Sequence, residues 1–470
     1  MAEKKGEKPK LVELNLNEVA QKTGGDILQG LPSLSFRTFN IDSRTTQPGD
    51  LFFALRAQRD GHSYIDDAAQ KGAAGAVISR PIIPPNPEIG LIQVPDTLIA
   101  LQILAEKVLD SQRVKVVGIT GSIGKTTTKE FAAALLARSF QVLKSEGNYN
   151  NHIGLPLSLL KLQEKDEVAV LEMGMSSPGE ITRLTQIAPP DIAVITNIHP
   201  VHLEFFDSIE EIARAKKEIL DGMRPDGTAV FNGDDTAVQK IARDWHGAKI
   251  LFGLSGGCDI RAENIQRSGY RGMAFDFIYG KKKGKAFIPF ICKSFLFNFL
   301  AASAAACALE APFEDILAQS QTLEPFPMRG AISHLPDGIV LVDDSYNSNP
   351  AALESVLADL SSLEAKRKVA ILGDMLELGK TQKSYHQEAG KHVKQYRWDV
   401  LLTVGPLSRH MAEGAMEAGM EDSHIASFEN ADEAAKQVLS FIEPGDLVLV
   451  KGSRGMRTDK IVDSLKKRGY

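Results

Sequence analysis

The residues best suited to chemistry lie between positions 116 and 128, where a β-branched run leads through glycines 118, 121 and 124 into Lys125-Thr126-Thr127. In a glycine-rich turn, backbone N–H groups converge on an anion, the following helix presents its positive end, and a lysine reaches the β- and γ-phosphates. The standard motif would open with a glycine at 119, which is Ile here, and Gly118 comes one residue too early. The order of strand, Gly-Lys-Thr and helix still predicts a nucleotide-binding loop, made of Gly121, Ser122, Ile123, Gly124, Lys125, Thr126 and Thr127.

Chemically active side chains also follow two apolar runs further along the chain. The run Val168–Leu171 ends on Glu172, and the run that starts at residue 191 ends on Asn197 and is followed by His202. Ligands of open α/β sheets bind outside the carboxyl ends of the strands, so these side chains are expected at the edge that carries Lys125. A carboxylate there would bind Mg²⁺ on the nucleotide. The alternatives are an exposed strand-end carboxylate and a hydrogen-bonded structural histidine.

Three other segments carry charged or polar side chains. Asp42-Ser43-Arg44 precedes a tight turn and suits a sugar or a diphosphate, although from the residues alone we favour a surface loop with a local Asp–Arg pair. Lys216 lies in a helical pattern over 209–220, which we interpret as a solvated charged face. Segments 343–350 and 451–455 follow two predicted strands, and they suit a second substrate and closure over the phosphate loop.

The elements that would position these groups divide the chain into three parts. Residues 1–110 contain short strands and helices, residues 111–325 alternate buried strands with amphipathic helices before a β-meander at 261–290, and residues 326–470 alternate strands and helices again. Such alternation predicts mostly parallel, doubly wound sheets. We therefore predict an α/β protein of three domains: a small N-terminal domain, a central phosphate-loop ATPase domain and a Rossmann-like C-terminal domain.

Composition narrows the classes of function and location. A chain of 470 residues is too long for a single core, and a net charge of −6 argues against a nucleic-acid-binding face. Three scattered cysteines without metal-ligand spacing indicate a reducing compartment. No apolar stretch follows the charged start, and the longest uncharged run, 294–309, is shorter than the roughly 20 residues that span a bilayer. We expect a cytoplasmic monomer that binds no nucleic acid and inserts into no membrane, with a buried helix at 294–309.

The loop with its offset Gly118 resembles the ATP loop of the Mur ligases, which form amide bonds in peptidoglycan synthesis. The resemblance extends from about residue 40 to the end of the chain. The motifs that agree in order and spacing are residues 147–154, Glu172-Met173-Gly174, Thr196-Asn197 with His202-Leu203, Ala215-Lys216, Met328-Arg329-Gly330 and Asp343-Asp344.

Within this family, segments 344–350, 371–379 and 451–454 resemble the branch that adds the D-alanyl-D-alanine dipeptide, and the Asp-Asn-Pro-Arg signature of the diamino-acid branch is absent. The resemblance implies an ADP-forming ligase that joins D-alanyl-D-alanine to UDP-N-acetylmuramoyl-tripeptide through an acyl phosphate. The nearest alternative is an amide ligase of the diamino-acid or folylpolyglutamate type. A nucleotide switch is a different class, but the Asn-Lys-x-Asp motif that reads guanine does not occur.

The resemblance also implies an ATP-binding and catalytic site. Lys125 and two Mg²⁺ ions would neutralise developing negative charge, with one ion held by Thr126 and Glu172 and the other by His202. Lys216 would be carbamylated to N6-carboxylysine, a carboxylate-like Mg²⁺ ligand, which replaces the solvated-face interpretation. The further ATP contacts implied are Asn298, Arg329 and Asp344.

Contacts to the other substrates follow from the same resemblance. Asp42, Ser43 and Arg44 match the family's UDP-binding motif, so the N-terminal domain would bind the UDP-sugar and the C-terminal domain the dipeptide. The family usually has His-Asn where this chain has Ser294 and Phe295, so that adenine contact is not carried over. The other substrate contacts implied are Asn148, Asn151, Tyr346, Asn347, Asn349, Ser453 and Arg454.

Overall fold

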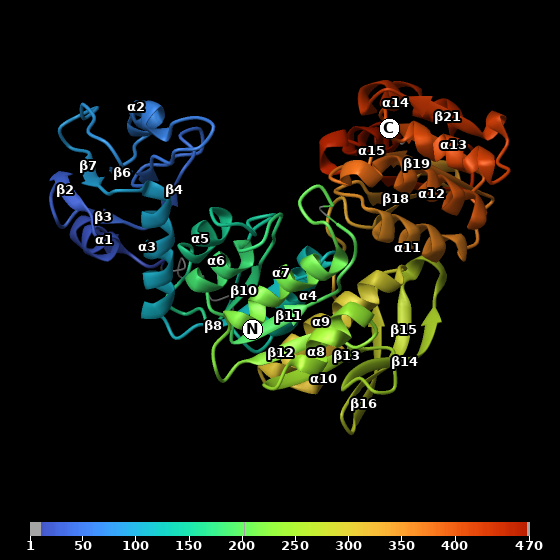
Figure 1. Cartoon of the computed structure of the whole chain (residues 1–470), viewed down its shortest axis with the longest axis horizontal. Helices are drawn as coiled ribbons and strands as arrows, with labels where there is room; N and C mark the ends of the chain where they lie inside the picture. Colours follow the sequence, from blue (N-terminus) through green and yellow to red (C-terminus); the bar gives the residue numbers. More distant parts are fainter. Residues whose placement is uncertain (1–10, 202, 468–470) are drawn as a thin grey trace, which may run out of the picture. The chain divides into compact units, whose positions relative to one another are not determined.

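The structure is a computed structural model, and it describes residues 11–201 and 203–467. Three sheets of five, nine and six strands follow one another along the chain, with a two-stranded ribbon beside the first (Figure 1). The chain divides into two compact units: Met1–Thr120 with Leu136–Val194 and Ala215–Ala229, and Gly121–Leu135 with Ile195–Arg214 and Val230–Tyr470. The nine-stranded sheet contributes strands to both units.

The N-terminal sheet has the order β2-β7-β6-β5-β4, with β2 antiparallel to β7 and the other neighbours parallel. Helix α2 packs on it through Ile65 and Ala68, which are buried with Phe52 and Ile78 in one apolar cluster. The elements of this part are β1 (Leu14–Asn15), α1 (Leu16–Thr23), β2 (Asp26–Gln29), β3 (Ser35–Phe36), β4 (Phe39–Asn40), β5 (Leu51–Phe53), α2 (Ile65–Gln70), β6 (Gly75–Ile78), β7 (Gly90–Gln93) and α3 (Thr97–Ser111).

The central sheet has the order β16-β15-β14-β13-β12-β11-β8-β10-β9. Strand β10 is parallel to both β8 and β9 and is buried along its whole length, as expected for a parallel strand covered on both faces. The strands of the central sheet are β8 (Lys115–Thr120), β9 (Val142–Lys144), β10 (Val168–Glu172), β11 (Ile192–Ile195), β12 (Thr228–Asn232), β13 (Ala248–Gly253), β14 (Ile260–Arg267), β15 (Met273–Tyr279) and β16 (Lys282–Ile288). The accompanying helices are α4 (Lys125–Leu136), α5 (Gly154–Leu159), α6 (Glu180–Ile187), α7 (Ile209–Asp221), α8 (Thr236–Asp244), α9 (Lys293–Ala308) and α10 (Phe313–Ser320).

Strands β14, β15 and β16 pair antiparallel and confirm the predicted meander. Helix α9 confirms the buried helix expected at 294–309, because apolar and alanine side chains cover it almost all round. Phe295, in its first turn, stacks on Phe290 with ring centroids 4.7 Å apart. An aromatic core contact therefore occupies one of the two positions where the resemblance had suggested adenine-binding residues.

The C-terminal sheet has the order β17-β18-β22-β19-β20-β21, and all neighbours are parallel except the edge strand β17. Helices α14 and α15 lie over one face, and α11 and α12 lie over the other (Figure 1). Its elements are β17 (Ala331–His334), β18 (Val340–Asp344), α11 (Pro350–Ser361), β19 (Arg367–Gly373), α12 (Gln382–Gln395), β20 (Val400–Val404), α13 (Arg409–Glu417), β21 (Ile425–Phe428), α14 (Ala431–Gln437), β22 (Asp446–Lys451) and α15 (Asp459–Lys467).

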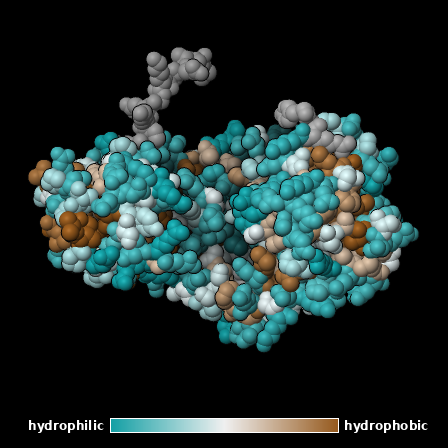
Figure 2. All heavy atoms as spheres, turned by 90° about the horizontal axis from the view of Figure 1, so that it is seen from above, coloured by the Kyte–Doolittle hydropathy of each residue, from teal (hydrophilic) through white to brown (hydrophobic). Residues whose placement is uncertain are grey.

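The three sheets with their helices confirm the predicted α/β class, while the exact domain limits stay a prediction. No helix in the described part of the chain is long and apolar enough to cross a membrane. Figure 2 shows a mostly hydrophilic surface, with apolar side chains gathered at the left end over the N-terminal sheet. Exposed apolar side chains of that sheet and its loops include Leu28, Leu31 and Ile83.

Candidate active site

The loop 121–124 joins the end of β8 to the start of α4, and its two glycines are required by their surroundings. Gly121 has a φ of +151°, and a Cβ there would lie 1.9 Å from Thr196 Oγ1. Gly124 has a φ of +84°, and a Cβ there would lie 2.2 Å from Asn298 Oδ1. Any other residue at either position would meet both an unfavourable backbone conformation and a side chain already in place. Asn298, which is buried, therefore forms one wall of the loop.

Asn197 braces the loop from the end of β11. Its side-chain oxygen accepts the Ile123 N–H at 2.9 Å, its amide nitrogen donates to the Ile123 carbonyl at 2.9 Å, and its own carbonyl accepts the Ser122 N–H at 3.0 Å. Thr196 donates its hydroxyl to the same Ile123 carbonyl at 2.8 Å. The strand-end amide predicted to share the ligand edge thus shapes the phosphate loop itself.

Lys125 begins α4 and folds back over the loop. Its Nζ donates to the carbonyl of Gly121 at 2.8 Å and of Ser122 at 3.4 Å. The first N–H groups of a helix have no partner within the helix, so the start of α4 offers donors to an anion beside this ammonium. The loop therefore has the parts that a nucleotide's phosphates require.

Gly118 is not part of this loop, which corrects the interpretation from the sequence. It lies inside β8, and a Cβ there would meet Pro190 Cγ at 2.8 Å, Met173 Sδ at 3.2 Å and Ile219 Cδ1 at 3.3 Å. The missing side chain makes room for close packing against the strand. The glycine at position 118, which is offset from the standard motif, is thus required by packing within the preceding strand β8.

Glu172 ends β10 and lies beside Ile119 in the parallel register with β8, two residues before the loop begins. It is only 2% exposed, so the alternative of an exposed strand-end carboxylate is wrong. Asn150 donates its side-chain N–H to Glu172 at 2.8 Å. A buried carboxylate with an oriented oxygen suits a hard cation.

Lys216 is also 2% exposed, so its interpretation as part of a solvated face is wrong. The predicted ligand His202 lies outside the described residues. Within the described residues, no three His, Cys, Asp or Glu side chains cluster as a ready metal site. Thr126 and Glu172 offer hard oxygen donors of the kind Mg²⁺ prefers, whereas an ammonium at 216 could not bind a cation.

The loops of the C-terminal domain bring several predicted residues together. Lys451 pairs with Asp344 at 2.6 Å and donates to the Asn347 carbonyl at 2.9 Å. The guanidinium group of Arg329 lies over the ring of Tyr346, with 3.9 Å from Cζ to the ring centroid. The guanidinium group of Arg454 lies over the same ring at 5.6 Å.

Neither Arg329 nor Arg454 has a carboxylate within ion-pair distance in the part of the chain that the structure describes. Arg454 donates to the Met328 sulfur at 3.4 Å. Two guanidinium groups that share one ring without an acidic partner favour an anionic ligand. The grouping suits a phosphate or the carboxylate of a peptide substrate.

Some predicted substrate contacts have local structural partners. Asn349 caps α11 by accepting the Ala352 N–H at 3.0 Å, and Asn151 accepts the N–H groups of Ile153 and Gly154. Ser453 is buried, and its hydroxyl accepts the Leu376 N–H at 2.9 Å. These bonds fix the turns on which the substrate-binding candidates stand. Among the residues that the structure describes, the Asn148 side chain forms no local hydrogen bond of this kind.

A residue without any signal in the sequence holds the segment after β19. His386 is fully buried in α12, and its Nε2 accepts the Met375 N–H at 3.0 Å. Burial lowers the pKa of this imidazole, which keeps it neutral and able to accept. A lone histidine on a helix gives no signal of this contact, because its partner is a backbone N–H in the loop before the helix and not another side chain.

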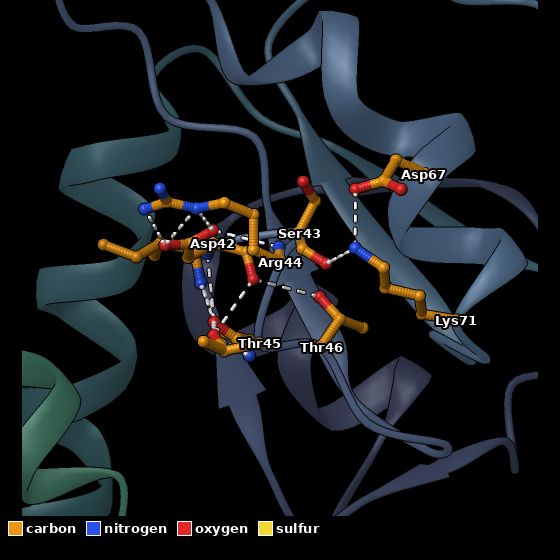
Figure 3. Close-up of polar contacts among 9 residues, drawn as sticks. Asp42, Ser43, Arg44, Thr45, Thr46, Asp67 and Lys71 are labelled. Carbon is orange, nitrogen blue, oxygen red and sulfur yellow. Dashed lines mark hydrogen bonds and ion pairs between the residues drawn. The ribbon is translucent and has the colours of Figure 1, made fainter.

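In the N-terminal domain, Asp42 and Arg44 form the local pair that the sequence analysis had favoured, with Nη2 to Oδ2 at 2.6 Å (Figure 3). The hydrogen bonds from Arg44 lower the pKa of Asp42 to about 2. Most of the Arg44 side chain is nevertheless exposed, so its guanidinium is accessible to a ligand. Ser43 is buried and contacts Lys71 and Asp67, two residues that the sequence analysis did not consider.

Comparison with known proteins places these groups in one family. Residues 119–306 match the Mur ligase middle domain, and residues 328–454 match the Mur ligase glutamate ligase domain. The chain is 36% identical over 428 residues to the UDP-N-acetylmuramoyl-tripeptide–D-alanyl-D-alanine ligase of Bacillus subtilis, covering 90% of this chain and 92% of that protein. It also resembles the crystal structure of MurF from Acinetobacter baumannii, with a TM-score of 0.88, 28% identity, and coverage of 97% of this chain and 99% of that one.

A second solved structure carries a nucleotide. The crystal structure of MurF from Thermotoga maritima in complex with ADP has a TM-score of 0.81 and 29% identity, and the match covers 92% of this chain and 97% of that one. The two family matches and the near full-length similarity agree with the loop geometry described above. The chain belongs to the Mur ligase family.

Proposed function

We propose that this chain is an ATP-dependent ligase that joins D-alanyl-D-alanine to UDP-N-acetylmuramoyl-tripeptide in peptidoglycan precursor synthesis. The observation that carries the proposal is the loop 121–124, walled by Thr196 and Asn298 and followed by Lys125, in a chain so similar to enzymes of that name. The cytoplasm, where ATP and the UDP-linked precursor occur, is the proposed site of action of this enzyme, which we propose acts as a monomer.

The proposed reaction has two steps. A carboxylate oxygen of the tripeptide attacks the γ-phosphorus of ATP, the bond to ADP breaks, and an acyl phosphate forms. The dipeptide amine attacks the acyl carbon and loses a proton, and the carbon–oxygen bond breaks to release phosphate. Both steps gather negative charge on phosphoryl oxygens, which Lys125 and the first turn of α4 would stabilise.

Two Mg²⁺ ions are part of the proposal, and they supply further positive charge at the phosphates when bound. The Thr126 hydroxyl and the Glu172 carboxylate would hold one ion, and His202 the other. Lys216 would become a ligand after carbamylation, in which its neutral amine bonds to the carbon of CO₂ and releases a proton. Its burial would protect the resulting carbamate from water.

The remaining groups recognise the substrates. Asn298, Arg329 and Asp344 would contact ATP. Asp42, Ser43 and Arg44 would bind the UDP moiety, and the other polar candidates would bind the tripeptide and the dipeptide. Those candidates are Asn148, Asn151, Tyr346, Asn347, Asn349, Ser453 and Arg454.

Phosphate release from ATP tests the proposal. We expect release only when the UDP-linked tripeptide and D-alanyl-D-alanine are both present, and no release when a diamino acid or glutamate replaces the dipeptide. Hydrolysis of ATP that is indifferent to either substrate would contradict the ligase assignment, and turnover with a diamino acid would move the chain to another branch of the family.

The role of Lys216 has its own test. We expect Lys216→Ala to lose turnover and to recover part of it with a short carboxylic acid, which would replace the carbamate oxygens. Mass spectrometry of the intact wild-type protein under CO₂ should show the added carboxyl group. A fully active Lys216→Ala enzyme would remove Lys216 from the site.

A further inference from the structure

The segment Asp42-Ser43-Arg44 owes most of its shape to hydrogen bonds within its own loop. Asp42 accepts the Arg44 N–H at 3.0 Å, and its carbonyl accepts the hydroxyls of Thr45 at 3.1 Å and Thr46 at 3.3 Å. Figure 3 shows these contacts gathered around the Asp42 side. Such bonds fix the local turn but do not fix where the turn stands on the domain.

Contacts from outside the loop reach Ser43. Lys71 Nζ donates to the Ser43 carbonyl at 2.8 Å and to Asp67 Oδ2 at 3.0 Å (Figure 3). A hydrogen bond from the Ser43 side chain, followed by one from Lys71, lowers the pKa of Asp67. Lys71 therefore holds the serine at its carbonyl, and Asp67 in turn holds the Lys71 ammonium. Among the described residues, these hydrogen bonds are the ones that connect residues 42–44 to side chains beyond residue 50.

Helix α2 gives both side chains a fixed origin. Asp67 lies within the helix and Lys71 is the C-cap residue directly after it, so the two face the same side one turn apart. Ile65 and Ala68 anchor the helix in the core under the sheet, at 2% and 1% exposure. The position of the helix thus determines where Ser43 lies, and the position of Ser43 determines where the backbone of Arg44 begins.

We propose that Lys71 is a positioning residue for the nucleotide-sugar substrate, because it ties the Ser43 carbonyl to helix α2 and so places the Ser43 and Arg44 groups that meet the UDP moiety. This inference rests on the proposed role of Asp42-Ser43-Arg44 in UDP binding. Lys71 acts through Ser43 and is not assigned a contact with the substrate. Its ammonium also adds a positive charge beside a loop that must receive an anionic ligand.

The variant Lys71→Met tests the inference, because methionine keeps the length of the side chain and removes the donor and the charge. We expect KM for the UDP-linked tripeptide to rise about threefold to tenfold, the usual scale for a partly exposed hydrogen bond from a charged donor. We expect kcat and the KM values for ATP and D-alanyl-D-alanine to change less than about twofold, because the loop lies in another domain. Lys71→Arg, which keeps charge and donors, should restore most of the affinity.

Lys391→Met is the matched control, since Lys391 forms a comparable exposed ion pair with Glu417 at 3.0 Å in the C-terminal domain. Its KM for the UDP-linked tripeptide should equal that of the wild type, and its thermal midpoint should match that of Lys71→Met. An unchanged KM in Lys71→Met, or an equal rise in all three KM values together with a lower midpoint, would overturn the inference.

Arg44→Met separates this inference from the proposed UDP site. If Arg44→Met raises KM for the UDP-linked tripeptide and Lys71→Met does not, only the positioning role of Lys71 fails. If Arg44→Met also leaves that KM unchanged, the assignment of the Asp42-Ser43-Arg44 loop to UDP fails, and the role of Lys71 fails with it.

Discussion

Replacing Gly118 and Gly121 separately by alanine should have different consequences, although both glycines belong to the same sequence motif. At position 118 the new Cβ would lie 2.8 Å from Pro190 Cγ and 3.2 Å from Met173 Sδ. The backbone there is ordinary strand, so the cost is overpacking alone, about 1–3 kcal/mol of unfolding free energy. At position 121 the Cβ would lie 1.9 Å from Thr196 Oγ1 in a backbone with a φ of +151°.

Thr196 cannot easily move away, because its hydroxyl is bonded to the Ile123 carbonyl at 2.8 Å. Gly121→Ala must therefore displace the loop, and a displacement of about 1 Å in a catalytic site costs on the order of 100-fold in rate. Gly118→Ala should keep its KM for ATP within about twofold of the wild-type value, since the loop is untouched.

Urea unfolding followed by circular dichroism measures the stability of each variant, and initial rates at varied ATP measure its kcat/KM. We expect Gly118→Ala to unfold at lower urea with nearly normal kinetics, and Gly121→Ala to lose activity by about 100-fold. If Gly118→Ala lost ATP affinity without losing stability, Gly118 would belong to the nucleotide site and our assignment of it to strand packing would be refuted. An active Gly121→Ala enzyme would refute the steric argument for the loop.

Three further predictions concern other parts of the molecule. Asp344→Asn should lower the free energy of unfolding in urea by about 2 kcal/mol or more, because it leaves the Lys451 ammonium, at 4% exposure, without its carboxylate. Lys451→Met should lower it less, and equal losses of unfolding free energy in the two variants would contradict this. Burial raises the pKa of Cys258 to about 11 and of Cys307 to about 12, so alkylation of the native protein near pH 8 should be negligible until denaturant is added, and fast labelling of either thiol would contradict it. Tyr346→Leu should lower kcat/KM for ATP or the dipeptide about threefold to tenfold, because both guanidinium groups lie over the face of the ring. Tyr346→Phe keeps the ring and should stay near the wild type. A defect in Tyr346→Phe would contradict the role of the ring in holding the two guanidinium groups.

The sequence predicted the fold class because its strands are short, apolar and separated by amphipathic helices. Strands such as β10 and β22 are buried along their whole length, and such strands appear as continuous apolar runs. The phosphate loop was predictable for a similar reason, since Gly-Lys-Thr after a strand has a direct physical meaning. In these cases local pattern and tertiary structure agree.

The predictions that failed depended on packing between distant segments. Lys216 lies beside Lys217 in a charged helical pattern, and only the fold shows that the first is buried while the second pairs with Asp221 at the surface. Gly118 was interpreted as an offset glycine of the loop motif because Gly121 and Gly124 follow it, whereas its environment comes from Pro190 and Met173. Charge and spacing in the sequence carry no information on such contacts.

The proposed reaction depends on activation of a substrate carboxylate as an acyl phosphate. Isotope transfer tests it directly, with UDP-N-acetylmuramoyl-tripeptide carrying ¹⁸O in its terminal carboxylate and with ATP and D-alanyl-D-alanine unlabelled. We expect the released phosphate to contain one ¹⁸O atom for each amide bond formed, since the oxygen that attacks the γ-phosphorus leaves with it. Phosphate without ¹⁸O, formed alongside the amide product, would contradict the acyl-phosphate mechanism.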